Sequence, residues 1–307
     1  MAHTTVRTPS TVGNFGPGFD ATSLAIAWGG DTVRVTVADE DHITLEGAGA
    51  EQVPTAWADN CCSAAFTFLR DRHGVSDKHN LHITKGVHPG SGLGSSASSS
   101  AAGALAFAKL YPEVTVWTPE AVVEAATYGE ARVAGAHGDD VAAAIMGGLS
   151  IVAKGRVGRV QPPASLHLAI CVPRFSLETR LMREAVGKTV AVPDAVSNLA
   201  NVAFLVDAMH RGDIDMIAHS LTDRIAAPGR KQHLPFHDDV VKAATDAGAI
   251  GCAISGSGPA MFTVTDDAKQ AKVFAEAMAD AVAEHGREAF PLACKAERTR
   301  VFDQILR

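Results

Sequence analysis

A loop rich in glycine and serine, at residues 89–98, has the residue types and spacing of an anion site. Its glycines, Gly90, Gly92 and Gly94, allow the main chain to approach a ligand closely, and its serine hydroxyls add donors to a row of unpaired amides. The alanine-rich run 97–110 predicts a helix whose partly positive N-terminus opens onto the loop. Amides at a helix N-terminus bind anions, so the loop predicts a phosphate site.

The spacing of this loop differs from two familiar phosphate loops. No Lys-Ser or Lys-Thr follows the last glycine, as a Walker-type loop requires. The glycines are spaced G-x-G-x-G and no acidic residue lies about twenty positions further on, which argues against a dinucleotide fingerprint. Composition alone also leaves a plain turn or linker open, because Gly/Ser-rich stretches often have no other role.

Candidate polar groups also stand in a second sharply turned loop, at residues 10–20. Asn14 and Asp20 are its two strong polar side chains, among three glycines and a proline. Both residue types form turns by bonding their own backbone, so turn formation is the alternative to a binding role.

Further along, a single acid stands in an alanine-rich, largely apolar helix predicted over 121–136. If Glu130 is buried there, its carboxylate demands a cation or hydrogen-bond donors; a solvated surface position is the alternative. His137 follows seven residues later, close to the same helical face.

Arginines in the second half of the chain are the candidates for binding a carboxylate, because the planar guanidinium holds two oxygens at once. Arg183 and Arg230 are the two we single out, whereas Arg180 is expected to lie on the surface.

Bulk properties exclude several functions. The chain has 307 residues, 47% of them hydrophobic and 20% charged, with 27 Lys and Arg against 34 Asp and Glu and hence a formal net charge of −7. This length predicts one large or two medium domains. A mildly acidic chain argues against nucleic acid or an anionic membrane as the main partner. Five cysteines without a C-x-x-C pair indicate reduced thiols, and the start lacks the apolar core of a signal peptide, so we expect a cytoplasmic protein.

The expected elements place the glycine loop between a strand and a helix. Strands are expected at 6–9, at 31–37 with a hairpin partner at 43–46, at 81–84 before the loop, at 167–172, on both sides of the glycine turn within 248–262, and finally at 301–305. Helices are expected at 60–70, 97–110, 121–136, 196–211, 214–224, 240–247 and 269–285. A polar turn near 154–159 marks a domain boundary.

Several of these motifs resemble the GHMP kinase superfamily. The stretch Pro-Gly-Ser-Gly-Leu-Gly-Ser-Ser-Ala from Pro89 is similar to its second signature, and Gly-Ala-Ile-Gly-Cys-Ala-Ile-Ser-Gly-Ser-Gly-Pro from Gly248 is similar to its third. The segments 10–20, 129–149, 173–183 and 223–235 resemble patterns of its homoserine kinase family. The resemblance implies an α+β, two-domain fold: a ribosomal protein S5 domain 2-like N-terminal domain at 1–153, and a ferredoxin-like C-terminal domain at 154–307 whose last strand returns to the first domain.

The resemblance also implies an ATP-dependent kinase that uses Mg²⁺ and phosphorylates the hydroxyl of L-homoserine in threonine biosynthesis. A homodimer is the one assembly that we consider for it. It assigns Mg²⁺ to Ser96 and Glu130, the latter counted as catalytic. It assigns the amino acid to Asn14, Asp20, His137, Arg183 and Arg230, with Asp20 on the amine and the arginines on the carboxylate. It assigns ATP to Pro89, Gly90, Ser91, Gly92, Leu93, Gly94, Ser95, Ser96, Ala97 and Ser98.

Two departures from the homoserine kinase pattern stand out. Thr22 and Ser23 occupy positions where the pattern has Leu-Gly, and Asp140 replaces an asparagine. Mevalonate kinases carry a catalytic aspartate at about this place, so Asp140 is either a general base or a helix-capping or surface acid beside Asp139. The alternatives are therefore a mevalonate-type kinase or decarboxylase that uses Asp140, and a non-catalytic binding protein with the same fold.

Overall fold

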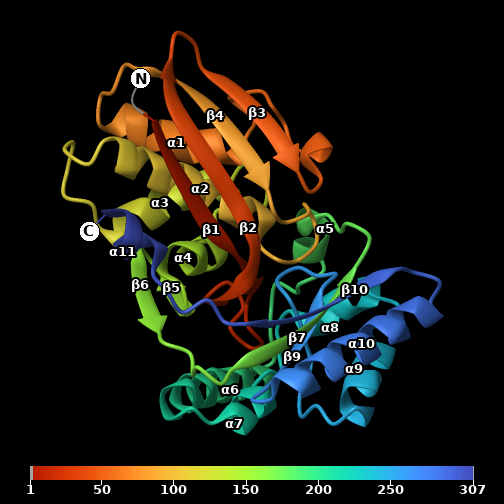
Figure 1. The fold of residues 1–307 in the computed structure, drawn as a ribbon. Helices are drawn as coiled ribbons and strands as arrows, with labels where there is room; N and C mark the ends of the chain where they lie inside the picture. The colour runs from red at the N-terminus through yellow and green to blue at the C-terminus, as the bar shows by residue number, and fades with distance from the viewer. Residues whose placement is uncertain (1–2, 307) are drawn as a thin grey trace.

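The computed structural model describes residues 3–306, which form two lobes, each built on one β-sheet (Figure 1). The first sheet has the order β3-β4-β2-β5-β6, and β1 pairs with β2 beside this path. Its strands are β1 (His3–Gly13), β2 (Thr22–Ala38), β3 (His42–Gly47), β4 (Lys78–Lys85), β5 (Leu149–Ala153) and β6 (Arg156–Val160). The polar turn at Lys154 therefore joins two strands of this sheet.

The hairpin expected between 31–37 and 43–46 is wrong. β3 pairs with β4, in parallel, with Ile43 opposite Leu81. The long strand β2 is flanked by β1 on one side and by β4 on the other over residues 32–36, so both of its hydrogen-bonding edges are occupied there. The segment after β2 is left to pair on the outer edge of β4.

The helices of the first lobe surround one central helix. They are α1 (Cys61–Arg72), α2 (Ser95–Leu110), α3 (Pro119–Glu130) and α4 (Asp139–Met146), preceded by a 3-10 turn, η1 (Ala50–Gln52). α2 packs against the other three, and nearly all of its side chains are buried because most of them are the small alanines and serines. Asn60 caps α1 by accepting from the amide of Cys62 at 2.9 Å.

The second lobe has a four-stranded antiparallel sheet in the order β10-β7-β9-β8, which is the strand order of a ferredoxin-like domain. Alternate residues of β7 face opposite cores: Leu168 and Ile170 meet α6 and α7, whereas Ala169 and Cys171 meet α9 and α10. The strands are β7 (His167–Pro173), β8 (Ala253–Ile254), β9 (Met261–Thr265) and β10 (Ala289–Lys295). The helices are α5 (Thr179–Glu184), α6 (Val192–Arg211), α7 (Ile214–His219), α8 (Ala227–Arg230), η2 (Lys231–His233), α9 (His237–Asp246) and α10 (Ala268–Glu284).

Three further expectations about elements are wrong. The helix expected at 121–136 ends at Glu130, six residues before its expected end. α7 ends at His219, five residues before the expected end, since Asp223 accepts from the amides of residues 225–227 and forms a turn instead. The expected last strand is a helix, α11 (Val301–Leu306), because its apolar residues follow helical spacing. The tail does return to the first lobe: Val301 and Phe302 belong to the core around α2, and Figure 1 shows α11 beside the helices of that lobe. None of the helices within residues 3–306 is long and apolar enough to cross a membrane.

Candidate active site

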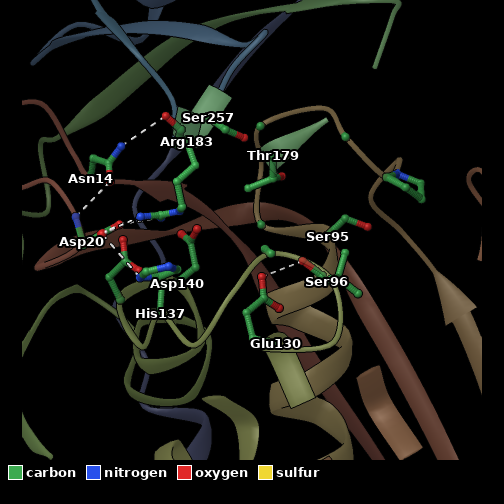
Figure 2. Close-up of a pocket in the computed structure, with 18 of the residues that line it drawn as sticks. Asn14, Asp20, Ser95, Ser96, Glu130, His137, Asp140, Thr179, Arg183 and Ser257 are labelled. Carbon is green, nitrogen blue, oxygen red and sulfur yellow. Dashed lines mark hydrogen bonds and ion pairs between the residues drawn. The ribbon is translucent and has the colours of Figure 1, made fainter. Parts of the chain in front are cut away.

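A cleft between the two lobes brings most of the predicted residues together. Figure 2 shows Ser96 and Glu130 on one side of it, and Asp20, His137 and Arg183 on the other. The predicted residues that line it are Asn14, Asp20, Pro89, Gly90, Gly92, Gly94, Ser95, Ser96, Glu130, His137, Asp140, Arg183 and Arg230. They come from the loop after β1, the glycine loop before α2, the turn before α4, and helices α2, α3, α4, α5 and α8.

Four residues of the predicted phosphate loop lie outside the lining of this cleft. Leu93 and Ala97 are buried in hydrophobic cores, and Ser98 bonds Thr8 and the amide of Asp31. Ser91 is buried as well. Successive side chains of a helix point in different directions around its axis. The buried residues therefore hold the loop and the helix in place, while Ser95 and Ser96 line the cleft.

The glycine loop has the form of an anion cradle. Gly94 is the N-cap of α2 with a φ of 68°, and without a side chain it leaves the first amides of the helix free to bind a ligand. The turn between β8 and β9 meets this loop from the second lobe: the Ser255 hydroxyl donates to the carbonyl oxygen of Gly92 at 2.6 Å. The amide of Ala260 donates to the carbonyl oxygen of Ser91 at 3.3 Å. Two glycine turns from different lobes thus enclose one end of the cleft.

A buried ion pair lies beneath this cradle. Lys85 and Asp31 pair directly, with side chains 1% and 0% exposed. Lys85 also donates to the carbonyl of Ser95 at 3.1 Å and to the hydroxyl of Ser99 at 2.9 Å, and so fixes the first turn of α2. The amide of Gly86 donates to Asp31 at 3.0 Å. No motif in the sequence predicted this pair, whose partners are 54 residues apart. The one available signal was a single charged residue, Asp31, in a stretch that alternates polar and apolar residues.

Glu130 and Ser96 meet beside the cradle. The Ser96 hydroxyl donates to Glu130 Oε1 at 2.7 Å, while Glu130 Oε2 is buried and accepts no hydrogen bond from the described residues. Burial raises the pKa of Glu130 to about 7. A buried carboxylate oxygen without a partner is the environment in which a cation is expected.

Charged groups of opposite sign pair at the other end of the cleft. Both η nitrogens of Arg183 donate to the Asp20 carboxylate at 2.9 Å, and His137 Nδ1 lies 3.4 Å from Asp20 Oδ2. The hydrogen bonds that Arg183 donates to Asp20 raise the pKa of Arg183, whereas burial lowers the pKa of His137 and favours its neutral form. Arg183 Nε is buried without a hydrogen-bond partner in the described structure. Arg180, by contrast, is 81% exposed, as expected.

Arg230 forms the wall behind this pair. It is 4% exposed, and its Nη1 donates to the carbonyl of Gly256 at 2.6 Å. Asn14 donates to the same carbonyl at 3.1 Å, which ties the first loop to the glycine turn of the second lobe. The guanidinium groups of Arg183 and Arg230 lie 5.5 Å and 5.2 Å from the centre of the Phe19 ring. Phe19 therefore orients both arginines by cation–π contact.

Asp139 and Asp140 begin α4, and both line the cleft. Asp140 accepts two hydrogen bonds on Oδ1, from Thr11 at 2.6 Å and from Ser23 at 2.7 Å. Burial raises the pKa of both acids, and that of Asp139 further, since Asp140 and Asp20 lie near it. Asp140 is thus a half-buried acid at the cleft and no surface residue.

The structure accounts for the two unusual residues after the first loop. The Thr22 hydroxyl donates to the carbonyl of Asn14 at 2.8 Å, and Ser23 donates to that of Val12 at 3.1 Å in addition to Asp140. Both side chains are buried. Leucine and glycine would offer neither hydrogen bond.

The cleft is also lined by residues that were not predicted to be site residues. Thr179 lies one α5 turn before Arg183, and Ser257 stands in the glycine turn that approaches the cradle. Thr179 matches a family pattern and Ser257 belongs to a recognised motif, so a signal existed for both. Val133 and Ala134 follow Glu130 and carried no signal beyond their position.

The chain matches two models of one protein family. The model for the GHMP kinases N terminal domain matches residues 60–148, and the model for GHMP kinases C terminal matches residues 205–284. The first match contains the glycine loop, α2 and Glu130. Fold, cleft and models together define a GHMP kinase.

Similar proteins specify the branch of this class. A homoserine kinase of Halobacterium salinarum is 38% identical over 304 residues, covering 99% of this chain and 96% of that protein. One of Pyrococcus abyssi is 37% identical, covering 86% and 88%. A crystal structure of homoserine kinase from Cytophaga hutchinsonii has a TM-score of 0.89 with 30% identity, covering 97% and 96%. The chain therefore belongs to the homoserine kinase family.

Proposed function

We propose that this chain transfers the γ-phosphoryl group of ATP to the side-chain hydroxyl of L-homoserine, which yields O-phospho-L-homoserine for threonine biosynthesis. One observation supports this most directly: the cleft has an amide cradle at one end and a carboxylate with two guanidinium groups at the other. An amino acid carries the complementary ammonium and carboxylate, and its side-chain hydroxyl would then project toward the cradle.

The residues at the cradle would serve ATP. The first amides of α2 and the glycine turns would hold the triphosphate, and Ser96 with Glu130 would hold Mg²⁺, which supplies neutralisation of phosphate charge when bound. Phosphoryl transfer needs in-line positioning and charge stabilisation more than covalent chemistry from the protein. The rigid floor beneath the cradle, fixed by Lys85, serves that positioning.

The residues at the opposite end would bind the amino acid. Asp20 would accept from the ammonium, Arg183 and Arg230 would donate to the carboxylate, and Asn14 and His137 would complete the orientation. The neutral form of His137, which burial favours, can still donate one hydrogen bond and accept another. Asp140 is the candidate general base for the hydroxyl. A cytoplasmic location and a possible homodimer stay predictions from the sequence.

The test is ADP release by the purified protein with ATP, Mg²⁺ and one alcohol at a time. We expect turnover with L-homoserine that exceeds turnover with L-threonine, L-serine or mevalonate. Preference for mevalonate would favour the mevalonate-type alternative that Asp140 suggested. Homoserine binding without any phosphorylated product would favour a non-catalytic binding protein.

A further inference from the structure

Two hydroxyl groups converge on one oxygen of a half-buried acid, Asp140, at the reacting end of the cleft. We propose that Thr11 and Ser23 are positioning residues that hold Asp140 in the one orientation in which its second oxygen takes the proton of the acceptor hydroxyl. This inference rests on the proposed kinase function. It adds to that function two residues, on β1 and β2, that contact neither the phosphates nor the charged ends of the amino acid in the proposed arrangement.

The geometry fixes both carboxylate oxygens of Asp140. Thr11 Oγ1 and Ser23 Oγ donate to Oδ1 at 2.6 Å and 2.7 Å. Oδ2 receives no hydrogen bond from residues 3–306 and lies against the Cα of Gly13, where an added Cβ would stand 2.7 Å from it. With Oδ1 occupied twice, Oδ2 is the oxygen left for a proton. Any side chain at position 13 would displace it.

Thr11 also couples this acid to the phosphate cradle. Its amide donates to the carbonyl of Leu93 at 3.2 Å, and its hydroxyl would lie 1.9 Å from a Cβ added to Gly94. The N-cap of α2 is thus packed directly on the group that holds Asp140. This contact sets the position of the acid relative to the first amides of the helix, where the transferred group would lie.

The surrounding charges decide which of the two neighbouring acids can accept a proton. Asp140 faces Asp20 from the first loop, Asp139 from its own helix and Glu130 from α3, with Arg183 and Arg230 across the cleft. Burial raises the pKa of Asp140, and the hydrogen bonds from Thr11 and Ser23 oppose that rise because they favour the ionised form. Asp139 accepts no such side-chain hydroxyl in the described structure, and its pKa is raised well above the ordinary value. The hydroxyl hydrogen bonds therefore favour the ionised, proton-accepting form at Asp140 and not at Asp139.

The step balances without any further reactant. The acceptor hydroxyl oxygen forms a bond to the γ-phosphorus as the bond from that phosphorus to the β,γ-bridging oxygen breaks, and ADP leaves with that electron pair. The hydroxyl proton passes to Asp140 Oδ2 and later to solvent. The hydroxyls of Thr11 and Ser23 remain on Oδ1 throughout, so the carboxylate does not rotate.

The same contact links two departures from the family pattern. The homoserine kinase pattern has glycine where this chain has Ser23 and asparagine where it has Asp140, and here these two side chains are hydrogen-bonded partners across 117 residues. Glycine has no hydroxyl to donate, and asparagine cannot accept a proton as a carboxylate does. The serine and the aspartate therefore act as one unit in this chain.

The test is the pH profile of kcat/KM for homoserine, from about pH 5 to pH 9, in wild type and in variants. Thr11→Val and Ser23→Ala each remove one hydrogen bond of about 1.4 kcal/mol, so the acid limb should move up by about one pH unit for either. KM should change little. Thr11→Ser keeps the hydroxyl and should keep the wild-type limb. Ser150→Ala is the control, because Ser150 donates to the Asp139 carbonyl at 3.1 Å and does not touch the Asp140 carboxylate.

Each result supports or overturns a separate claim. Asp140→Asn should lower kcat at least 100-fold; near-normal turnover would overturn the base role and with it the inference. An inactive Asp140→Asn with unmoved acid limbs in Thr11→Val and Ser23→Ala would overturn the positioning roles alone. If Thr11 and Ser23 had a purely structural role, their variants would have a lower melting temperature and an unmoved acid limb. Ser150→Ala would then have a lower melting temperature as well. Absence of homoserine phosphorylation by wild type would instead contradict the proposed function itself.

Discussion

Arg183 and Asp20 neutralise each other through two hydrogen bonds of 2.9 Å at one end of the cleft. In the proposed function, these groups bind the two opposite charges of one amino acid. A ligand must then exchange one ion pair for two new ones. A molecule that carries only one of the two charges breaks the pair and leaves Arg183 or Asp20 without a partner.

This exchange predicts a strict requirement for a zwitterion. 4-Hydroxybutanoate lacks the ammonium of homoserine, and 3-amino-1-propanol lacks its carboxylate. Leaving one half-buried charge unpaired costs about 3 kcal/mol, so we expect the KM of either analogue to exceed that of homoserine by about 100-fold. Steady-state kinetics with the three alcohols measures this. An analogue with a KM within tenfold of the homoserine value would show that the pair does not exchange.

Removal of Arg183 should weaken binding of homoserine more than catalysis. Arg183→Ala should raise the KM for homoserine by about 30–150-fold, equivalent to about 2–3 kcal/mol, with a smaller change in kcat. Arg180→Ala is the matched control, because Arg180 lies on the same helix, 81% exposed and 3.9 Å from Glu184. An unchanged KM in Arg183→Ala would remove this arginine from the substrate site.

Glu130 should lower the stability of the protein at neutral and alkaline pH. Its pKa rises from 4.5 to about 7 on folding, so the folded chain binds this proton more tightly, and stability falls as the pH rises from 4.5 to 7. The cost above pH 7 is about 3 kcal/mol. Glu130→Gln has no carboxylate to ionise, so its melting temperature at pH 8 should be roughly 5 °C higher than that of wild type, with no gain at pH 4.5.

A neighbouring acid provides the control for that measurement. Glu124 is on the same helix, but its pKa is lowered by the hydrogen bonds from Arg72, so Glu124→Gln should lose stability at pH 8 where Glu130→Gln gains it. Thermal melts at the two pH values distinguish the signs. If Glu130 also binds Mg²⁺, the stabilised variant should be inactive as a kinase; full activity in Glu130→Gln would contradict the metal assignment.

Gly92 should be required for binding of ATP because of its surroundings as well as its φ of 83°. An added Cβ would lie 2.8 Å from the carbonyl oxygen of Gly258, so Gly92→Ala pushes the two glycine turns apart. We expect the KM for ATP to rise at least tenfold. Gly74→Ala is the control: Gly74 has a φ of 65° and nothing within 4 Å of an added Cβ, so it carries only the backbone strain of about 1–2 kcal/mol. Equal KM values for ATP in the two variants would contradict the contact.

Local signals in the sequence were sufficient to predict the phosphate cradle. The strand, the glycine turn and helix α2 follow one another along the chain, so their types and order could be read from spacing and propensity. The resemblance then supplied Asn14, Asp20, His137, Arg183 and Arg230, which the fold brings to one cleft. Sequence motifs predict site residues well where each motif is short and contiguous in the chain.

Contacts between distant segments were the part that could not be read. The parallel pairing of β3 depends on β2 being already flanked on both edges, which no local pattern encodes. The Lys85 and Asp31 pair spans 54 residues, and the Ser23 contact with Asp140 spans 117. Each involves residue types that are usually solvated. Their contacts depend on how the strands and helices of the first lobe assemble.

The location of α11 has a consequence for how the chain matures on the ribosome. Domains generally fold as units during synthesis, starting from the N-terminal side. Val301 and Phe302 nevertheless complete the core around α2, although every strand of the second sheet is translated before them. The core of the first lobe therefore stays incomplete, with apolar surface exposed at α2 and α4, until the whole second lobe has been translated.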